Sequence, residues 1–323
     1  MQLPPSEFAE VQKFRFDAEV EASDGVAGKL NWVVADPATR VITFVGIKPG
    51  LFGMTYDVPV RFVSAADDQT VTLSIALDEI KQYGTRPPGA QLNRSTHVAT
   101  SNNKHLGRLL QLTINRQTAA LRHLVVERLG RESLVNAGFI TTVSAKQISV
   151  NLGNLQPGQL TPYRSDANLR DEVQQRLFDY ARLRPDLSGI TIHAIDGAVW
   201  LKGHVSSDVN RRMIDDLLEH VTGLSELHNE LLADNQLAAA VSYALSYDPR
   251  TAGQRIGVYP RLGSVFLRGV VQSPAASTAA TEIATKIPGV EGVTNEMRVN
   301  PQFTNVPDLA AVTNMEDLVP GGS

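Results

Sequence analysis

The chain has 323 residues, of which 42% are hydrophobic, and it carries 30 basic and 34 acidic side chains with no cysteine. Balanced charge gives no global attraction to nucleic acid, and the lack of cysteine excludes disulfides and thiolate metal sites. At about 100–200 residues per domain, this length predicts two domains or more.

The opening residues, Met1–Glu10, have neither the basic region nor the apolar region of a secretory signal. No apolar run approaches the roughly 20 residues that cross a bilayer. Unless a leader was removed upstream of Met1, we expect a cytoplasmic protein, with peripheral contact to a membrane as the alternative.

The first half of the chain predicts strands separated by short turns. Ser23–Gly25 and Asp36–Thr39 consist of residues typical of turns, and Val41–Val45 consists of residues that favour strands. The pattern Gly28-Lys-Leu, Asp36-Pro-Ala-Thr, Ile42 returns 79 residues later as Gly107-Arg-Leu, Asn115-Arg-Gln-Thr, Leu121. We expect two mostly-β modules at residues 14–84 and 92–155, and a linker at Gln156–Pro162.

These β modules resemble the PRC-barrel family, whose pattern is a Gly-x-Leu strand, an Asp-x-x-Thr turn, a second strand and a Val-Pro segment, here Val58-Pro59. The second copy departs from it, with Asn115 for the turn aspartate and Ile140-Thr141 in place of Val-Pro. The resemblance implies two small barrel-like folds used for docking.

Charge is segregated between these two modules. Phe16–Ile80 has ten acids and four bases, whereas Arg86–Arg131 has eight bases and one acid, Glu127. A candidate basic patch comprises Arg94, Arg108, Arg116, Arg122, Arg128 and Arg131. This segregation of charge favours docking between the two modules or between chains, with a solvated surface or an anionic partner as alternatives. Nucleic acid is disfavoured because no aromatic residue for base stacking lies between Arg86 and Arg131.

The second half contains an internal repeat. Residues 190–231 align with 256–297 at a constant offset of 66, which matches Gly197 with Gly263, Gly203 with Gly269 and Asn229 with Asn295. Upstream, Leu169, Val173 and Leu177 recur at an offset of 68. Each copy predicts helix, strand, strand, helix, strand, with a tight hairpin at Asp196-Gly197 in the first.

Both copies resemble the BON domain. Copy one carries Val199-Trp-Leu-Lys-Gly203-His-Val and Asn229-Glu-Leu, and copy two carries Val265-Phe-Leu-Arg-Gly269-Val-Val and Asn295-Glu-Met. The resemblance implies αββαβ modules at 165–233 and 234–300, followed by a flexible tail at 301–323. It also implies a non-catalytic role of the kind associated with phospholipid surfaces, envelope stress, assembly of complexes or potassium sensing.

The face of each sheet opposite the helices is the main candidate binding site. Strand alternation puts His193, Trp200 and Lys202 on this face in copy one, and Tyr259, Phe266 and Arg268 in copy two. Aromatic side chains on an open sheet face are typical of contact surfaces. The alternatives are packing within the chain, self-assembly or partner binding, and binding of lipid or a small ligand.

The sequence contains no phosphate-binding loop, dinucleotide fingerprint, nucleophile elbow or His-Glu-x-x-His motif. We therefore expect no catalytic residues, metal, cofactor or small-molecule substrate. The first hypothesis is a non-enzymatic scaffold that self-associates into an oligomer or an extended assembly. The second is a peripheral adaptor on anionic phospholipid, and the third is an ion or small-ligand sensor.

Overall fold

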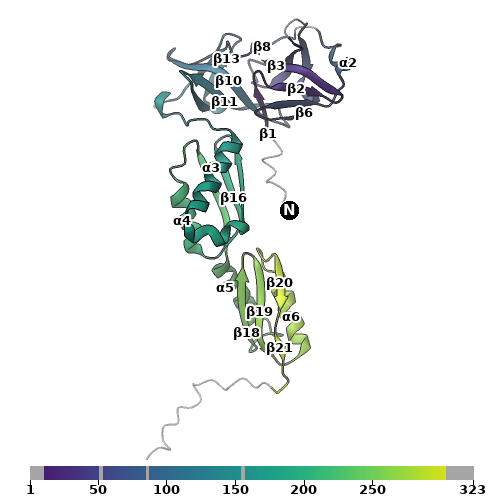
Figure 1. Cartoon of the computed structure of the whole chain (residues 1–323), viewed down its shortest axis with the longest axis vertical. Helices are drawn as coiled ribbons and strands as arrows, with labels where there is room; N and C mark the ends of the chain where they lie inside the picture. The colour runs from purple at the N-terminus through teal and green to yellow at the C-terminus, as the bar shows by residue number, and fades with distance from the viewer. Residues whose placement is uncertain (1–10, 51–53, 85–86, 154–156, 303–323) are drawn as a thin grey trace, which may run out of the picture. The chain divides into compact units, whose positions relative to one another are not determined.

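The computed structural model describes residues 11–50, 54–84, 87–153 and 157–302. It has a mostly-β N-terminal half and an α+β C-terminal half, which confirms the predicted fold class (Figure 1). The chain divides into two compact units. The first comprises residues up to Gln175, Ile192–Trp200 and Glu219–His228; the second comprises the remainder. Apart from Pro301 and Gln302, the expected tail lies outside the described residues.

The first β-module is one seven-stranded sheet with a short 3-10 helix, η1 (Val60–Phe62), and a one-turn helix, α2 (Leu77–Ile80). Six strands follow the order β5-β4-β3-β2-β7-β6, and β8 pairs with β3. Their bounds are β2 (Glu19–Ala22), β3 (Gly25–Ala35), β4 (Ile42–Lys48), β5 (Tyr56–Pro59), β6 (Val63–Ala66), β7 (Thr70–Leu73) and β8 (Ala90–Leu92).

The second β-module repeats this order as β12-β11-β10-β9-β14-β13, with β1 paired to β10 and η2 (Ala137–Phe139) in the place of η1. The strands are β1 (Val11–Arg15), β9 (His97–Thr100), β10 (His105–Asn115), β11 (Leu121–Arg128), β12 (Arg131–Asn136), β13 (Ile140–Val143) and β14 (Gln147–Val150). After η3 (Pro157–Gln159), Pro162 pairs with Ser133 beside β12.

The two β-modules exchange their opening strands. β1 precedes the first module but pairs with β10 of the second, and β8 precedes the second but pairs with β3 of the first. Phe14 lies opposite Leu112, Leu92 lies opposite Val33, and both Phe14 and Leu92 are fully buried. One continuous apolar core contains both residues, so the modules form a single packed body.

A glycine in the same position of each module explains part of the 79-residue repeat. Gly28 and Gly107 have φ of +139° and +155°, where L side chains are rarely found. A Cβ on Gly28 would collide with the carbonyl oxygen of Lys48, and one on Gly107 would collide with that of Glu127. Because β3 and β10 pass so close to the next strand, only glycine fits at these positions.

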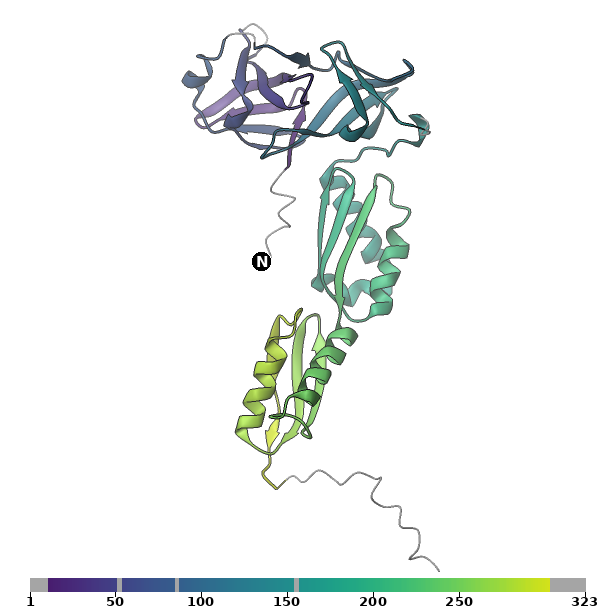
Figure 2. The same ribbon diagram turned by 180° about the vertical axis from the view of Figure 1, so that it is seen from behind.

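The C-terminal half contains two αββαβ modules, each with helices on one face of its sheet (Figures 1 and 2). In the first, the sheet order is β15-β16-β17, and in the second it is β18-β19-β20 with β21 paired to β19. The first module comprises α3 (Asp166–Asp179), η4 (Ala181–Gly189), β15 (Ile190–Ile195), β16 (Ala198–Val205), α4 (Asp208–Leu218) and β17 (Glu226–Ala233). The second comprises α5 (Asp234–Tyr247), β18 (Arg255–Arg261), β19 (Ser264–Val271), α6 (Pro274–Thr285), β20 (Gly292–Asn295) and β21 (Arg298–Val299).

Repeated asparagines tie the last strand to the second helix in both αββαβ modules. The side-chain amide of Asn229 donates to the Arg211 carbonyl and the Asp215 carboxylate on α4. That of Asn295 donates to Ser277 and Thr281 on α6, which are the equivalent positions 66 residues later. The same bond at the same place in both copies explains why the sequence repeats this residue.

The second helix of each αββαβ module also begins in the same way. The hydroxyl of Ser207 accepts from the Asn210 amide at the start of α4, and Ser273 does the same for Ala276 at the start of α6. A serine at this position satisfies an amide that has no partner within the helix.

Candidate interaction site

The outer sheet face of the second αββαβ module carries an exposed aromatic and cationic cluster. Tyr259 lies opposite Phe266 in the β18–β19 pair, and Gly257 lies opposite Arg268, as strand alternation predicted. Val265 and Leu267, which alternate with Phe266, are fully buried. We call Tyr259, Phe266 and Arg268 the outer-face cluster.

Arg268 holds the outer-face cluster together. Its guanidinium carbon lies 5.5 Å from the Tyr259 ring centre and 5.9 Å from that of Phe266, within the range of cation–π attraction. Its Nε donates to Glu296 at 2.6 Å. Tyr259 is 54% exposed and Phe266 is partly buried. The cluster therefore presents flat, partly preorganised rings to solvent.

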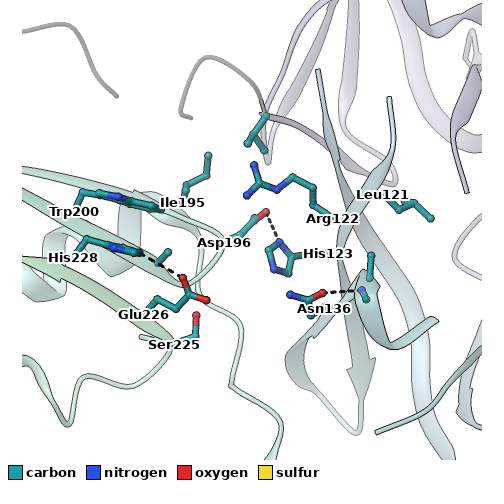
Figure 3. Close-up of a pocket in the computed structure, with 14 residues that line it drawn as sticks. Leu121, Arg122, His123, Asn136, Ile195, Asp196, Trp200, Ser225, Glu226 and His228 are labelled. Carbon is teal, nitrogen blue, oxygen red and sulfur yellow. Dashed lines mark hydrogen bonds and ion pairs between the residues drawn. The ribbon is translucent and has the colours of Figure 1, made fainter. Parts of the chain in front are cut away.

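The equivalent face of the first αββαβ module is covered. Trp200 is only 8% exposed, and its ring stacks on His228 with centres 4.5 Å apart and planes 9° apart. The two rings line a pocket of about 440 Å³ that also includes Arg122 and Asn136 of the second β-module (Figure 3). Trp200 is thus an internal packing residue, whereas its counterpart Phe266 is partly open.

The other two residues predicted for this face are less prominent. Lys202 forms an ion pair with Glu230 at 3.2 Å, and the side chain of Lys202 is 31% exposed. His193 is partly buried on β15 and has a partner of its own. Lys202 and His193 therefore do not form an exposed aromatic surface on the first αββαβ module.

The predicted basic patch is divided among several strands and turns of the second β-module, and all six arginines are exposed. Arg94 forms an ion pair with Asp17 of the acidic first module at 2.7 Å. Arg128 donates to the main-chain oxygen of His105. Within the described residues, the remaining four have no ion pair; they are Arg108, Arg116, Arg122 and Arg131.

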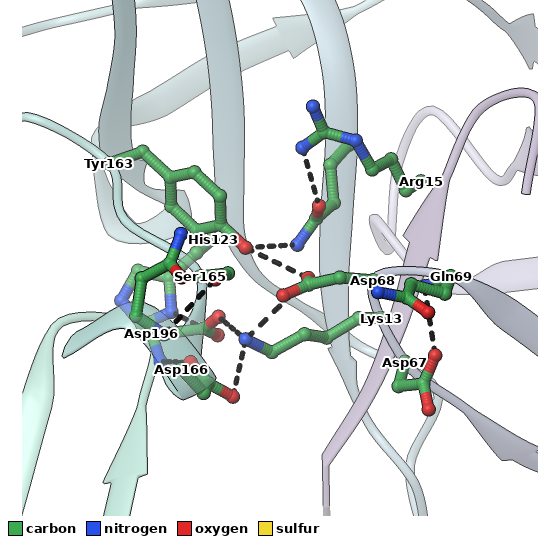
Figure 4. Close-up of polar contacts among 12 residues, drawn as sticks. Lys13, Arg15, Asp67, Asp68, Gln69, His123, Tyr163, Ser165, Asp166 and Asp196 are labelled. Carbon is green, nitrogen blue, oxygen red and sulfur yellow. Dashed lines mark hydrogen bonds and ion pairs between the residues drawn. The ribbon is translucent and has the colours of Figure 1, made fainter. Parts of the chain in front are cut away.

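A buried charge cluster, which the sequence did not reveal, joins the β-modules to the first αββαβ module (Figure 4). Nζ of Lys13 lies 2.7 Å from Asp166, 3.0 Å from Asp196 and 3.9 Å from Asp68. Asp196 also accepts from Nδ1 of His123 at 3.1 Å. The ion contacts thus link β1, β11, the β6–β7 turn, the start of α3 and the β15–β16 hairpin.

Neutral groups complete this cluster. The hydroxyl of Tyr163 donates to Asp68 at 2.8 Å and accepts from the amide of Gln111 at 3.0 Å. The main-chain amide of Asp196 donates to Asp166 at 2.9 Å. Since the Lys13 side chain is only 5% exposed, these contacts compensate a charge that has been removed from water.

The burial of these groups shifts their pKa values in different directions. Burial raises the pKa of Asp166 to about 6, although Lys13 opposes the shift. Burial alone would raise the pKa of Asp196, but the His123 hydrogen bond and the Lys13 charge outweigh it and lower that pKa to about 2. Burial would lower the pKa of Lys13, yet Asp196 and Asp166 reverse this and raise it.

A protein-family model matches the C-terminal half of the chain twice. The BON domain model matches residues 165–232 and 233–301. The C-terminal half contains two BON domains. No curated protein matches the chain.

Two solved structures are similar to part of the chain, and both are titled as CdsD, a structural protein of the type III secretion system of Chlamydia trachomatis. The C-terminal domain of CdsD is 19% identical, with 43% of this chain and 68% of that chain covered and a TM-score of 0.36. The other is 10% identical, with coverage of 48% and 100% and a TM-score of 0.23. TM-scores this low do not establish a common fold.

Sequence reasoning also missed an aromatic pair on the first helix of the second BON domain. Tyr243 and Tyr247 lie one turn apart on α5, are 64% and 71% exposed, and have ring centres 4.4 Å apart. The one available signal was helical spacing, because each tyrosine comes two residues after a buried position of the helix, Val241 or Leu245.

Two features of the described residues bear on metal binding and on membrane spanning. No group of three or more His, Asp or Glu side chains in this part of the chain is arranged to hold a metal ion. None of its helices is both long enough and apolar enough to span a membrane.

The raised pKa of Asp166 predicts a specific dependence of stability on pH. Asp166 holds its proton more tightly in the folded chain, with a pKa of about 6, than at its ordinary value of 3.8. The folding stability that Asp166 contributes is therefore fully present below pH 3.8 and is lost as the pH rises through 6. Relative to an Asp166→Asn variant, the wild type should lose stability across this window.

Urea unfolding of both proteins across the window checks this prediction. Subtracting the Asp166→Asn curve removes the contributions of other titrating groups, so only the difference matters. A difference that stays constant across the window would contradict the assignment of the shift to Asp166.

Proposed function

We propose that the protein is a non-enzymatic interaction protein whose modules dock in a self-associated assembly, with the outer-face cluster as the self-contact. The observation that carries this proposal is the exposure of Tyr259 beside Phe266 and Arg268 on the side of the sheet away from the helices. Tyrosine and arginine are enriched at interfaces because they combine large contact area with polar groups.

The difference between the two BON domains supports this assignment. In the first domain, the aromatic position is occupied by Trp200, which His228 covers. In the second domain, the same position is occupied by Phe266, and its cross-strand neighbour Tyr259 is open. One copy of a duplicated surface is used within the chain, and we infer that the other is covered by a second chain.

The second hypothesis, contact with anionic lipid, depends on other residues, in the second β-module. We also infer that both β-modules are PRC-barrel-like docking folds, as their repeated strand order and Gly-x-Leu strands suggest. The third hypothesis, a sensor of ions or small ligands, gains no specific support from the described side chains.

Light scattering across protein concentration tests the assembly. The wild type should exceed its monomer mass of 35.0 kDa increasingly as concentration rises, because association follows mass action. A Tyr259→Ala/Phe266→Ala double variant should stay at the monomer mass and keep its fold, since Tyr259 is largely exposed.

The matched control is Tyr243→Ala/Tyr247→Ala, which removes a comparable exposed aromatic pair from α5 of the same domain. This variant should associate like the wild type. A wild type that remains a monomer at high concentration and low salt would refute the proposal. Equal loss of association in both double variants would show that the outer-face cluster is not the specific contact.

A further inference from the structure

The hairpin between β11 and β12 ends in an unusual tip. Arg128 and Arg131 face each other as the last pair of the ladder, with Leu129 and Gly130 between them. Leu129 is 93% exposed, which makes it the most exposed large hydrophobic side chain in the described part of the chain. Arg128, Gly130 and Arg131 supply no second apolar side chain to shield it.

The backbone conformation of the turn is also unfavourable for a leucine at position 129. Leu129 and Gly130 have φ of +53° and +74°, the signs of a tight turn that favours Asn-Gly or Asp-Gly. The β15–β16 hairpin follows that preference with Asp196-Gly197. A backbone position that suits asparagine therefore holds a leucine that contacts almost nothing.

The hairpin of the second BON domain provides an internal comparison. Leu262 also precedes a glycine and has a φ of +46°. Its side chain, however, is partly buried and lies against Gly189, where an added Cβ would come within 3.1 Å of it. Leu262 thus gains packing inside the chain, and Leu129 does not.

Several arginines and histidines surround Leu129. Arg128 donates to the main-chain oxygen of His105 at 3.1 Å, and Nε2 of His105 lies 3.0 Å from Nδ1 of His97. Arg108 and Arg131 are exposed, and neither has an ion pair within the described residues. Two acids, Glu127 and Glu132, form the next pair of the ladder behind Arg128 and Arg131; the Glu127 carboxylate accepts from the Gly130 amide, and Glu132 forms an ion pair with Arg15 at 2.8 Å.

We propose that this hairpin is a membrane-contacting finger, which places Leu129 at the boundary between headgroups and acyl chains of an anionic phospholipid bilayer. Arg128, Arg131 and Arg108 would then meet lipid phosphates, because these three arginines are exposed around the tip while Glu132 is paired with Arg15 and Glu127 with the Gly130 amide. A protein groove fits less well, since a single leucine at the end of a turn offers little contact area for an apolar groove.

The proposed finger is independent of the outer-face cluster, so the two proposals can fail separately. One inserted leucine with a few arginines gives weak binding, which several copies on one surface would strengthen. The Tyr259→Ala/Phe266→Ala variant should therefore still bind vesicles, with reduced avidity if the chain self-associates.

The first test is co-sedimentation of the full chain with vesicles at low salt. We expect binding to phosphatidylglycerol mixed with phosphatidylcholine, and none to phosphatidylcholine alone. Leu129→Asn should reduce binding several-fold without loss of stability, because asparagine suits the positive φ of this turn. Failure of the wild type to bind the anionic vesicles, or unchanged binding by Leu129→Asn, would overturn the proposal.

The second test places a reporter at the tip. Because the chain has no cysteine, Leu129→Cys gives a unique site for an environment-sensitive fluorophore, and Asp78→Cys on exposed α2 is the control. Anionic vesicles should shift emission to the blue at position 129 alone. An equal response at both positions would overturn the proposal, as would a blue shift that depends on protein concentration without lipid, since that would identify a protein as the occupant.

Discussion

Replacing Lys13 with methionine should lower the free energy of unfolding by about 3–5 kcal/mol, because removing one partner leaves buried charges uncompensated. Lys13 is the cation between Asp166 and Asp196, and the Asp196 side chain is only 6% exposed. Methionine fills similar space but carries no charge. Urea unfolding of the full chain, followed by circular dichroism, measures the loss.

Two controls show whether the loss comes from buried charge. Lys81→Met breaks an ion pair with Asp78 in which both side chains are largely exposed, so it should leave stability unchanged within error. Adding Asp196→Asn to Lys13→Met should recover part of the loss, because it removes one of the stranded carboxylates. Strictly additive losses would indicate that the contact between Lys13 and Asp196 contributes nothing.

Replacing Trp200 with alanine should cost about 3–5 kcal/mol, the usual range for emptying a buried aromatic position. The ring is 8% exposed and stacked on His228, so its loss would leave a cavity and uncover that histidine. The change should not alter the assembled mass of the chain, since this ring is covered within its own chain.

Phe266→Ala is the matched control for Trp200→Ala, because the two residues occupy the same sheet position 66 residues apart. Phe266 is partly open, so its removal should cost about 1–2 kcal/mol. Equal losses at both positions, measured by thermal or urea unfolding, would mean that Phe266 is also a core residue. The outer-face cluster would then lose its main support.

The α+β half was predictable because its repeated residues make repeated local contacts. Asn229 and Asn295 bond to equivalent positions on the preceding helix of their module, and Ser207 and Ser273 cap that helix. Contacts of this kind depend on sequence spacing alone. The same reasoning placed Tyr259 opposite Phe266, because a two-residue hairpin fixes the register of its strands.

The sequence could not indicate which copy of the duplicated face is covered. Trp200 and Phe266 have the same alternation and the same flanking residues, but His228 stacks on Trp200 from the next strand, where the second copy has Thr294, and residues of the second β-module line the same pocket as Trp200. The buried charge cluster was hidden for a related reason. Lys13, Asp68 and Asp166 are far apart in the chain, and each has the ordinary appearance of a solvated charge.

The exchanged strands have a consequence for synthesis on the ribosome. Val11 pairs with Asn115, so β1 remains without its ladder partner until about a hundred more residues have been translated. At about 5–20 residues per second, that wait lasts roughly 5–20 seconds, with an apolar edge available to wrong partners. Deleting β1 should consequently destabilise the second β-module, which is translated later, more than the first.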